Sequence, residues 1–113
     1  MNDYYSVIYS EEALNDLRNI YSYISNELLG PSIAKEQVNR IRETIRNLNY
    51  LPSRNPVVNW EPWYSIGMHK ITVDNYVIFY TINTSTLTVS IVRIFYSGRN
   101  IEEIIKNTNE NKV

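Results

Sequence analysis

The clearest pattern in the chain is a pair of amphipathic segments in its first half. Apolar residues recur three or four positions apart between residues 11 and 29 and again between residues 31 and 50, so each segment predicts a helix with one apolar stripe. Ser10 is a favourable N-cap for the first helix, Gly30 suits its C-terminal end, and Pro31 suits the first turn of the second. Because the connection is short, we expect the two helices to run antiparallel as a hairpin.

Runs rich in β-branched and aromatic residues predict strands on both sides of this hairpin. One such run precedes it and three follow it, at residues 4–9, 68–73, 76–82 and 87–95. Asp74-Asn75 separates two of the later runs and fits a two-residue turn, so these three strands read as an antiparallel meander. The pattern alone does not say whether the first strand lies at an edge or inserts beside the last strand.

The remaining segments complete a single domain over residues 1–113. Residues 53–66 show no period but contain Trp60 and Trp63, which predicts an ordered loop whose aromatics either cover the core or bind a partner. Residues 101–106 predict a short helix and residues 107–113 a frayed polar tail. The fold class is therefore α+β: an N-terminal strand, an antiparallel helical hairpin packed on a mainly antiparallel sheet of about four strands, and a short C-terminal helix.

Composition argues against several kinds of site. The chain has no Cys and one His, so we expect no disulfide, no metal site and no cofactor. No apolar run approaches the ~20 residues of a membrane span, and the start lacks the basic residues of a secretory signal. These features predict a cytoplasmic protein with no membrane partner.

Charge is unevenly distributed along the chain. The formal net charge is -1, which argues against a nucleic-acid footprint over the whole protein. The first half is mildly acidic, whereas residues 52–100 carry a basic excess. Four cations in that region are the candidate partner- or phosphate-binding residues: Arg54, Lys70, Arg93 and Arg99.

The order of these elements, together with residues 76–80 and the run from Val92 to Arg99, resembles the RelE/ParE superfamily, the toxin components of bacterial type II toxin-antitoxin modules. The resemblance extends from Tyr5 to about Ile105, and the long hairpin and the Arg-containing closing segment are more similar to the ParE branch. It implies the α+β fold given above.

The resemblance also implies site residues, with departures from the family pattern. Arg93 matches the arginine of the last strand and Arg99 that of the closing motif, whereas His69 stands where the family usually has an arginine. Tyr96 replaces the usual histidine and Asn100 the usual aspartate. The candidate catalytic residues are therefore His69, Arg93, Tyr96 and Arg99.

The resemblance implies two competing functions, which are inhibition of DNA gyrase by protein binding and ribosome-dependent cleavage of mRNA without a metal. In the second, His69 would accept the proton, Arg93 and Arg99 would hold the phosphate, and Tyr96 would donate to the leaving oxygen or stack on a base. An RNA cleaver should be strongly cationic, and this chain is not, so we favour the non-enzymatic gyrase inhibitor. A third possibility is an inactive homologue that still binds its antitoxin.

The four candidate residues also have ordinary structural interpretations. A lone His on a strand is most often a surface or hydrogen-bonded residue, and Tyr96 is one of ten tyrosines. Arg93 can simply pair with Glu102 or Glu103.

The resemblance implies a protein partner in either case. The cognate antitoxin would wrap the toxin with a flexible C-terminal segment, either as a strand added to a sheet edge or as an amphipathic helix in a groove. We expect the complex to be a hetero-oligomer.

Overall fold

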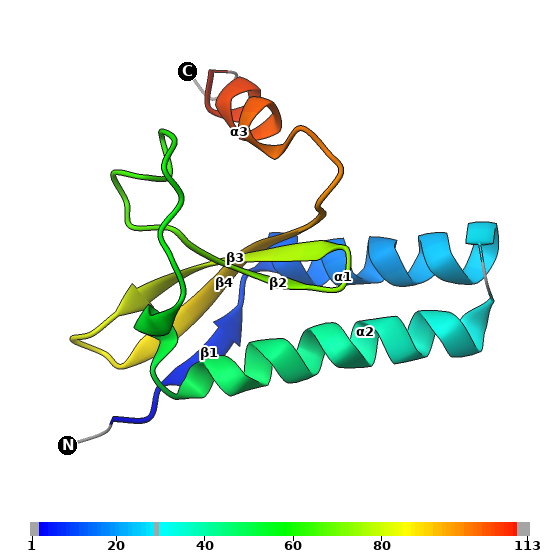
Figure 1. The fold of residues 1–113 in the computed structure, drawn as a ribbon, viewed down its shortest axis with the longest axis horizontal. Coiled ribbons are helices and arrows are strands. Elements are labelled where there is room, and N and C mark those ends of the chain that lie inside the picture. The colour runs from blue at the N-terminus through cyan, green and yellow to red at the C-terminus, as the bar shows by residue number, and fades with distance from the viewer. Residues whose placement is uncertain (1–2, 29, 111–113) are drawn as a thin grey trace.

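A four-stranded sheet forms the centre of the molecule in a computed structural model, which describes residues 3–28 and 30–110 (Figure 1). The spatial order of the strands is β1-β4-β3-β2. Their bounds are Ser6–Tyr9 for β1, His69–Val73 for β2, Tyr76–Asn83 for β3 and Thr88–Tyr96 for β4.

The three later strands form the predicted antiparallel meander, and β1 runs parallel to β4 with Ser6 opposite Thr88. The turn between β2 and β3 lies at Asp74-Asn75, where Asp74 has a φ of 53°. The first strand is shorter than predicted, because Tyr4 forms only an isolated bridge with Tyr50.

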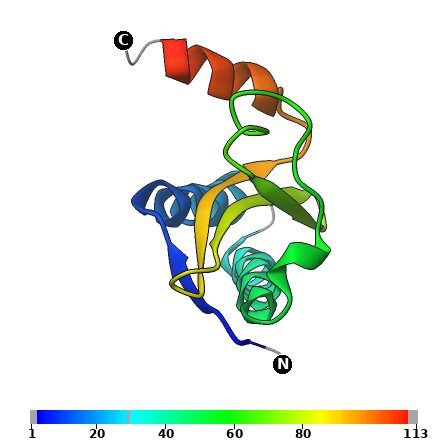
Figure 2. The same cartoon turned by 90° about the vertical axis from the view of Figure 1, so that its left-hand side faces the viewer.

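The predicted helical hairpin covers one face of this sheet (Figures 1 and 2). Helix α1 spans Glu11–Tyr23 and continues as a π-helical turn over Ile24–Leu28, and α2 spans Pro31–Arg46. The Ser10 hydroxyl accepts the Ala13 N–H at 2.9 Å, which confirms the N-cap. Gly30 has a φ of 96°, a conformation that favours glycine, and so allows the sharp reversal between the helices.

The core between the hairpin and the sheet follows directly from the two periodicities. Alternate residues of β3, Ile78 and Tyr80, face the helices and are fully buried. The predicted seam of the second helix is buried along its whole length, at Ala34, Val38, Ile41, Ile45 and Leu48. The hydrophobic stripe therefore holds the hairpin on the sheet.

A second core lies on the opposite face of the sheet, under the loop and helix α3 (Ile101–Glu110) (Figure 2). Trp60 stacks on Trp63 with ring centroids 5.1 Å apart, and Trp63 lies 4.7 Å from Phe79. Trp63 is buried, so this tryptophan covers the core.

Helix α3 is longer than the predicted 101–106. The prediction that a tail begins at residue 107 is wrong as far as Glu110, because the Thr108 hydroxyl donates to the Ile104 carbonyl at 2.8 Å within a continuing helix. The predicted tail at 111–113 lies outside the described residues. No helix within residues 3–28 and 30–110 is long and apolar enough to span a membrane.

Tyr80 provides a test of the packing between the sheet and the segment after α2. Its buried hydroxyl donates to the Pro52 carbonyl at 2.6 Å and accepts from the Asn55 amide at 3.0 Å. We expect Tyr80→Phe to lower the free energy of unfolding by about 1–2 kcal/mol, because both partners lose a hydrogen bond. Urea denaturation measures this, with the exposed Tyr64→Phe as the control; equal effects of the two variants would contradict the expectation.

Candidate functional site

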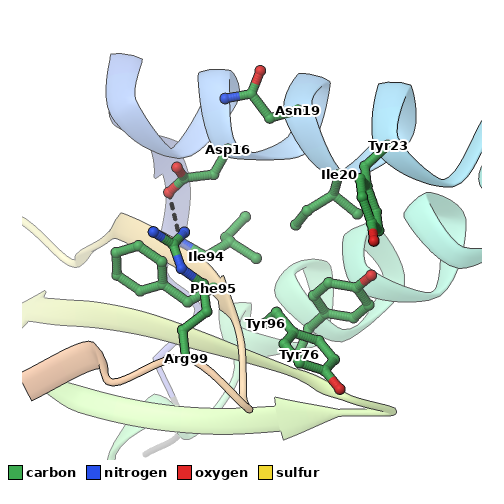
Figure 3. A pocket seen from close by; sticks show the side chains of 9 residues that line it. All are labelled: Asp16, Asn19, Ile20, Tyr23, Tyr76, Ile94, Phe95, Tyr96 and Arg99. Carbon is green, nitrogen blue, oxygen red and sulfur yellow. Dashed lines mark hydrogen bonds between the residues drawn. The ribbon is translucent and has the colours of Figure 1, made fainter. Parts of the chain in front are cut away.

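A single carboxylate joins α1 to the last strand. The Arg93 guanidinium donates to both oxygens of Asp16, with Nε to Oδ2 at 2.8 Å and Nη2 to Oδ1 at 3.0 Å. Asp16 Oδ2 also accepts the Ile94 backbone N–H at 2.9 Å (Figure 3). The Arg93 side chain is 26% exposed and that of Asp16 10%, so this pair is largely shielded from water.

The position of this contact follows from the short first strand. Strand β1 ends at Tyr9, and beyond Ile91 strand β4 has no strand on that side. Beyond that point, Ser10 and Asp16 form the hydrogen bonds that a neighbouring strand would otherwise form with β4. Ser10 donates its N–H to the Ile91 carbonyl and its hydroxyl to the Val92 carbonyl. Asp16 accepts the Ile94 N–H. Helix α1 therefore replaces β1 along this edge.

A groove opens where α1 and the ends of β3 and β4 diverge (Figure 3). Its volume is about 530 Å³. Three tyrosines from three different elements lie around it, and we call it the tyrosine groove. Its lining residues are Asp16, Asn19, Ile20, Tyr23, Tyr76, Ile94, Phe95, Tyr96 and Arg99.

The tyrosines differ in their burial. Tyr96 meets the edge of the Tyr76 ring at a centroid distance of 6.0 Å, and the Tyr23 and Tyr96 side chains are both exposed. Burial is the main cause that raises the pKa of Tyr76, with smaller contributions from Tyr96, Tyr23 and Asp74. Tyr76 is therefore a neutral phenol at physiological pH and can donate a hydrogen bond into the groove.

The turn after β4 fixes the position of Tyr96 and Arg99. The Arg99 N–H donates to the Tyr96 carbonyl at 3.1 Å. A Cβ on Gly98 would lie 2.4 Å from Cε2 of Tyr96, so the absence of a side chain at Gly98 lets the Tyr96 ring lie over the turn. The Arg99 guanidinium lies 5.2 Å from the centre of the Phe95 ring, and none of the ion pairs within the described residues includes it.

The structure places His69 away from this groove. Its Nδ1 donates to the Asn55 carbonyl at 2.7 Å, and its ring stacks on Tyr80. His69 pairs with Tyr80 on β3, and Tyr80 in turn pairs with Ile91 on β4. His69 therefore lies about 16 Å from Tyr96 along the strand direction, and about 10 Å from β4 across the sheet, which is two strand spacings.

Three of the four candidate catalytic residues, Arg93, Tyr96 and Arg99, lie around the end of β4. A single catalytic site would require all four residues to lie within reach of one another, and His69 does not, because the register of the β2–β3 hairpin holds it near the other end of the sheet. Their catalytic roles stay predictions.

The other predicted cations serve different parts of the molecule. Arg54 donates to the carbonyls of Asn47 and Leu51 at 3.1 and 3.0 Å, and so satisfies the end of the helical segment after α2. Lys70 is exposed on β2 beside Trp60. The four cations therefore do not form one patch.

Sequence reasoning assigned no role to Asp16, Tyr23 or Tyr76. Asp16 carried a usable signal, because it is an acid three residues after Ala13 and next to Leu17, inside the apolar stripe of α1. Tyr23 and Tyr76 carried none, since their proximity depends on the sheet. No group of three possible metal ligands occurs within residues 3–28 and 30–110.

A profile of the family described as "ParE toxin of type II toxin-antitoxin system, parDE" matches residues 7–101. The chain belongs to the ParE toxin family. A search of curated proteins finds no match.

Three solved structures are similar in fold to this ParE-family chain. The chromosomal ParDE system from Pseudomonas aeruginosa is 23% identical, covers 81% of this chain and 95% of its own, and has a TM-score of 0.66. The RelBE2 toxin-antitoxin complex from Mycobacterium tuberculosis is 21% identical, covers 83% and 92%, and has a TM-score of 0.59. The archaeal RelE-RelB complex from Pyrococcus horikoshii is 18% identical, covers 84% and 97%, and has a TM-score of 0.57.

The Asp16–Arg93 contact predicts a measurable loss of stability. Asp16→Asn leaves Arg93 without its carboxylate in a largely shielded site, so we expect the free energy of unfolding to fall by about 2–3 kcal/mol. The exposed Arg46–Glu43 pair offers a matched control, in which Glu43→Gln should cost less than about 0.5 kcal/mol. Similar values for both variants in urea denaturation would show that the contact does not hold α1 on β4.

Proposed function

We propose that this ParE-family chain is a growth-inhibiting toxin that acts by binding DNA gyrase. The supporting observation is that the candidate catalytic residues are engaged in structural contacts or lie apart from one another. Asp16 engages two N–H groups of the Arg93 guanidinium, and His69 lies at a distance from Tyr96 and Arg99. Cleavage at a 2′-hydroxyl needs a proton acceptor beside cations that hold the phosphate, and this arrangement favours action by contact instead.

The second part of the proposal is neutralisation by a cognate antitoxin in the cytoplasm. This part is supported by membership of the ParE toxin family and by the similar toxin-antitoxin complexes from Mycobacterium tuberculosis and Pyrococcus horikoshii. We propose a hetero-oligomeric complex in which the antitoxin covers the surface that meets the target.

The choice of target is tested with purified protein. We expect the chain to inhibit the supercoiling activity of DNA gyrase in the absence of ribosomes, and to leave mRNA intact when translating ribosomes are supplied. Ribosome-dependent cleavage with normal supercoiling would reject gyrase in favour of the mRNA endonuclease. Soluble protein that does neither, and permits normal growth without antitoxin, would identify an inactive homologue.

His69 separates the two mechanisms further. We expect His69→Gln to inhibit growth as strongly as the unchanged chain, within about threefold, because its contacts with Asn55 and Tyr80 are structural. Induced expression with a dilution series of colonies measures this, and Thr72→Ser at an exposed position of the same strand is the control. A loss of about 10²-fold or more for His69→Gln alone would indicate a general base and support the endonuclease.

A further inference from the structure

Strand β1 is an outer strand of the sheet, and part of its free edge has no partner (Figure 2). The Ser6 and Ser10 N–H groups both donate to backbone carbonyls on the side of β4. Because successive peptide groups of a strand point in opposite directions, the N–H and C=O groups of Val7 and Tyr9 face away from β4. These groups form no hydrogen bond within residues 3–28 and 30–110.

This edge lacks the features by which proteins keep outer strands from pairing. Residues 4–9 contain no charge, no Pro and no Gly, and all except Ser6 are aromatic or β-branched. Ile8 is 52% exposed on the face of the sheet opposite the hairpin. The other outer strand is protected, because Lys70 on β2 is charged and its N–H already donates to the Pro56 carbonyl at 3.0 Å. Strand β1 is therefore the edge that is suited to pairing with another strand.

A second copy of β1 matches this edge in one register. When two copies pair antiparallel with a two-fold axis at Ile8, Val7 of each chain lies opposite the partner's Tyr9. These residues exchange both of their N–H···O=C bonds, so every open group on both strands gains a hydrogen bond. The two Ile8 side chains then meet across the axis as a non-hydrogen-bonded pair, the closer of the two antiparallel arrangements. An axis at Val7 would instead need the Tyr5 N–H, which already donates to the Asn49 carbonyl at 2.7 Å.

Charge and shape on the hairpin side favour the same antiparallel arrangement. Strand β1 begins beside the end of α2, which carries Arg42 and Arg46, and leads into the acidic first turn of α1 at Glu11-Glu12. An antiparallel partner therefore brings its acidic turn toward the basic end of α2. A hollow of about 260 Å³ lies between these arginines and the side chains of Val7 and Tyr9. The partner's Tyr9 lies opposite Val7 on this face and so can fill the hollow.

We propose that this chain self-associates through β1 as a symmetric dimer, in which the two sheets join across an axis at Ile8. The occupant is a second copy because a two-fold contact requires one surface to complement itself. The stretch from Val7 to Tyr9 does so, with matching open groups, uncharged cross-strand pairs and opposite charges at its two ends. The contact is short, so we expect a weak dimer with a Kd between about 1 µM and about 1 mM.

Sedimentation velocity of the free chain from about 1 µM to about 1 mM tests the self-association. We expect a passage from monomer to dimer, and Ile8→Lys should raise the Kd at least about tenfold because it places two like charges opposite each other. Thr72→Lys, at an exposed position of the other outer strand, is the matched control and should alter the Kd less than about twofold. Both variants should keep a Tm within a few degrees of the unchanged chain. A monomer at every concentration, or equal Kd values for the two variants, would overturn the proposal.

A single introduced cysteine tests the register, since the chain has no Cys of its own. We expect Ile8→Cys to form an intermolecular disulfide under mild oxidation, because the Cβ atoms of a non-hydrogen-bonded antiparallel pair lie within reach of such a bond. Ser6→Cys on the same face is the control, since it would lie about 13 Å along the strand from the partner's Ser6. Non-reducing gel electrophoresis measures the yield of linked dimer. Equal or faster linkage of Ser6→Cys would reject an axis at Ile8.

Other occupants of the edge give different results. If the chain alone stays monomeric and Ile8→Lys weakens antitoxin binding, the edge belongs to the antitoxin. If species larger than a dimer form equally in Ile8→Lys and Thr72→Lys, the association is unspecific aggregation. Either result would overturn the proposal. Self-association is measured without gyrase or antitoxin, so its absence leaves the proposed function untouched, and a chain that does not inhibit gyrase can still form the dimer.

Discussion

The Asp16 carboxylate is the interaction on which the arrangement of this molecule depends. It binds the Arg93 guanidinium through two hydrogen bonds and the Ile94 N–H through a third, so one side chain of α1 fixes both the backbone and a side chain of β4. Hydrophobic packing holds the hairpin on the sheet but is not directional. The contact between Asp16 and Arg93 fixes the position of α1 along β4, because two parallel hydrogen bonds between a carboxylate and a guanidinium require one relative placement of the two groups.

This contact also explains why no strand pairs with the end of β4 on the side of α1. Ser10 and Asp16 accept or donate the hydrogen bonds of β4 where β1 has ended, and helix α1 then continues past the end of the sheet (Figure 1). The space that results is lined by tyrosines from α1, β3 and β4 (Figure 3). A truncated first strand and a helix that substitutes for it are therefore what produce the groove.

The contacts made by Arg93 and Arg54 help to decide whether this chain is a binding protein or an enzyme. Arg93 lies between Asp16 and the Phe95 ring, and Arg54 satisfies carbonyls after α2, so both stabilise the fold. Of the site residues named from the resemblance, Tyr96 and Arg99 line the groove itself. Among the described residues, Arg99 is the one cation that lines this aromatic surface, which is therefore suited to recognising a protein and is a poor match to a polyanion.

The sequence by itself determined the helical hairpin, its caps, the turn at Asp74 and the meander, because each depends on periodicity and turn preferences among residues close in the chain. The tertiary structure decided where β1 pairs, which end of the sheet holds His69, and that Asp16 meets Arg93, 77 residues away. It also decided that Tyr23, Tyr76 and Tyr96 share a groove. Strand order and register arise from contacts between distant segments, and local patterns carry no record of which segment will be the neighbour.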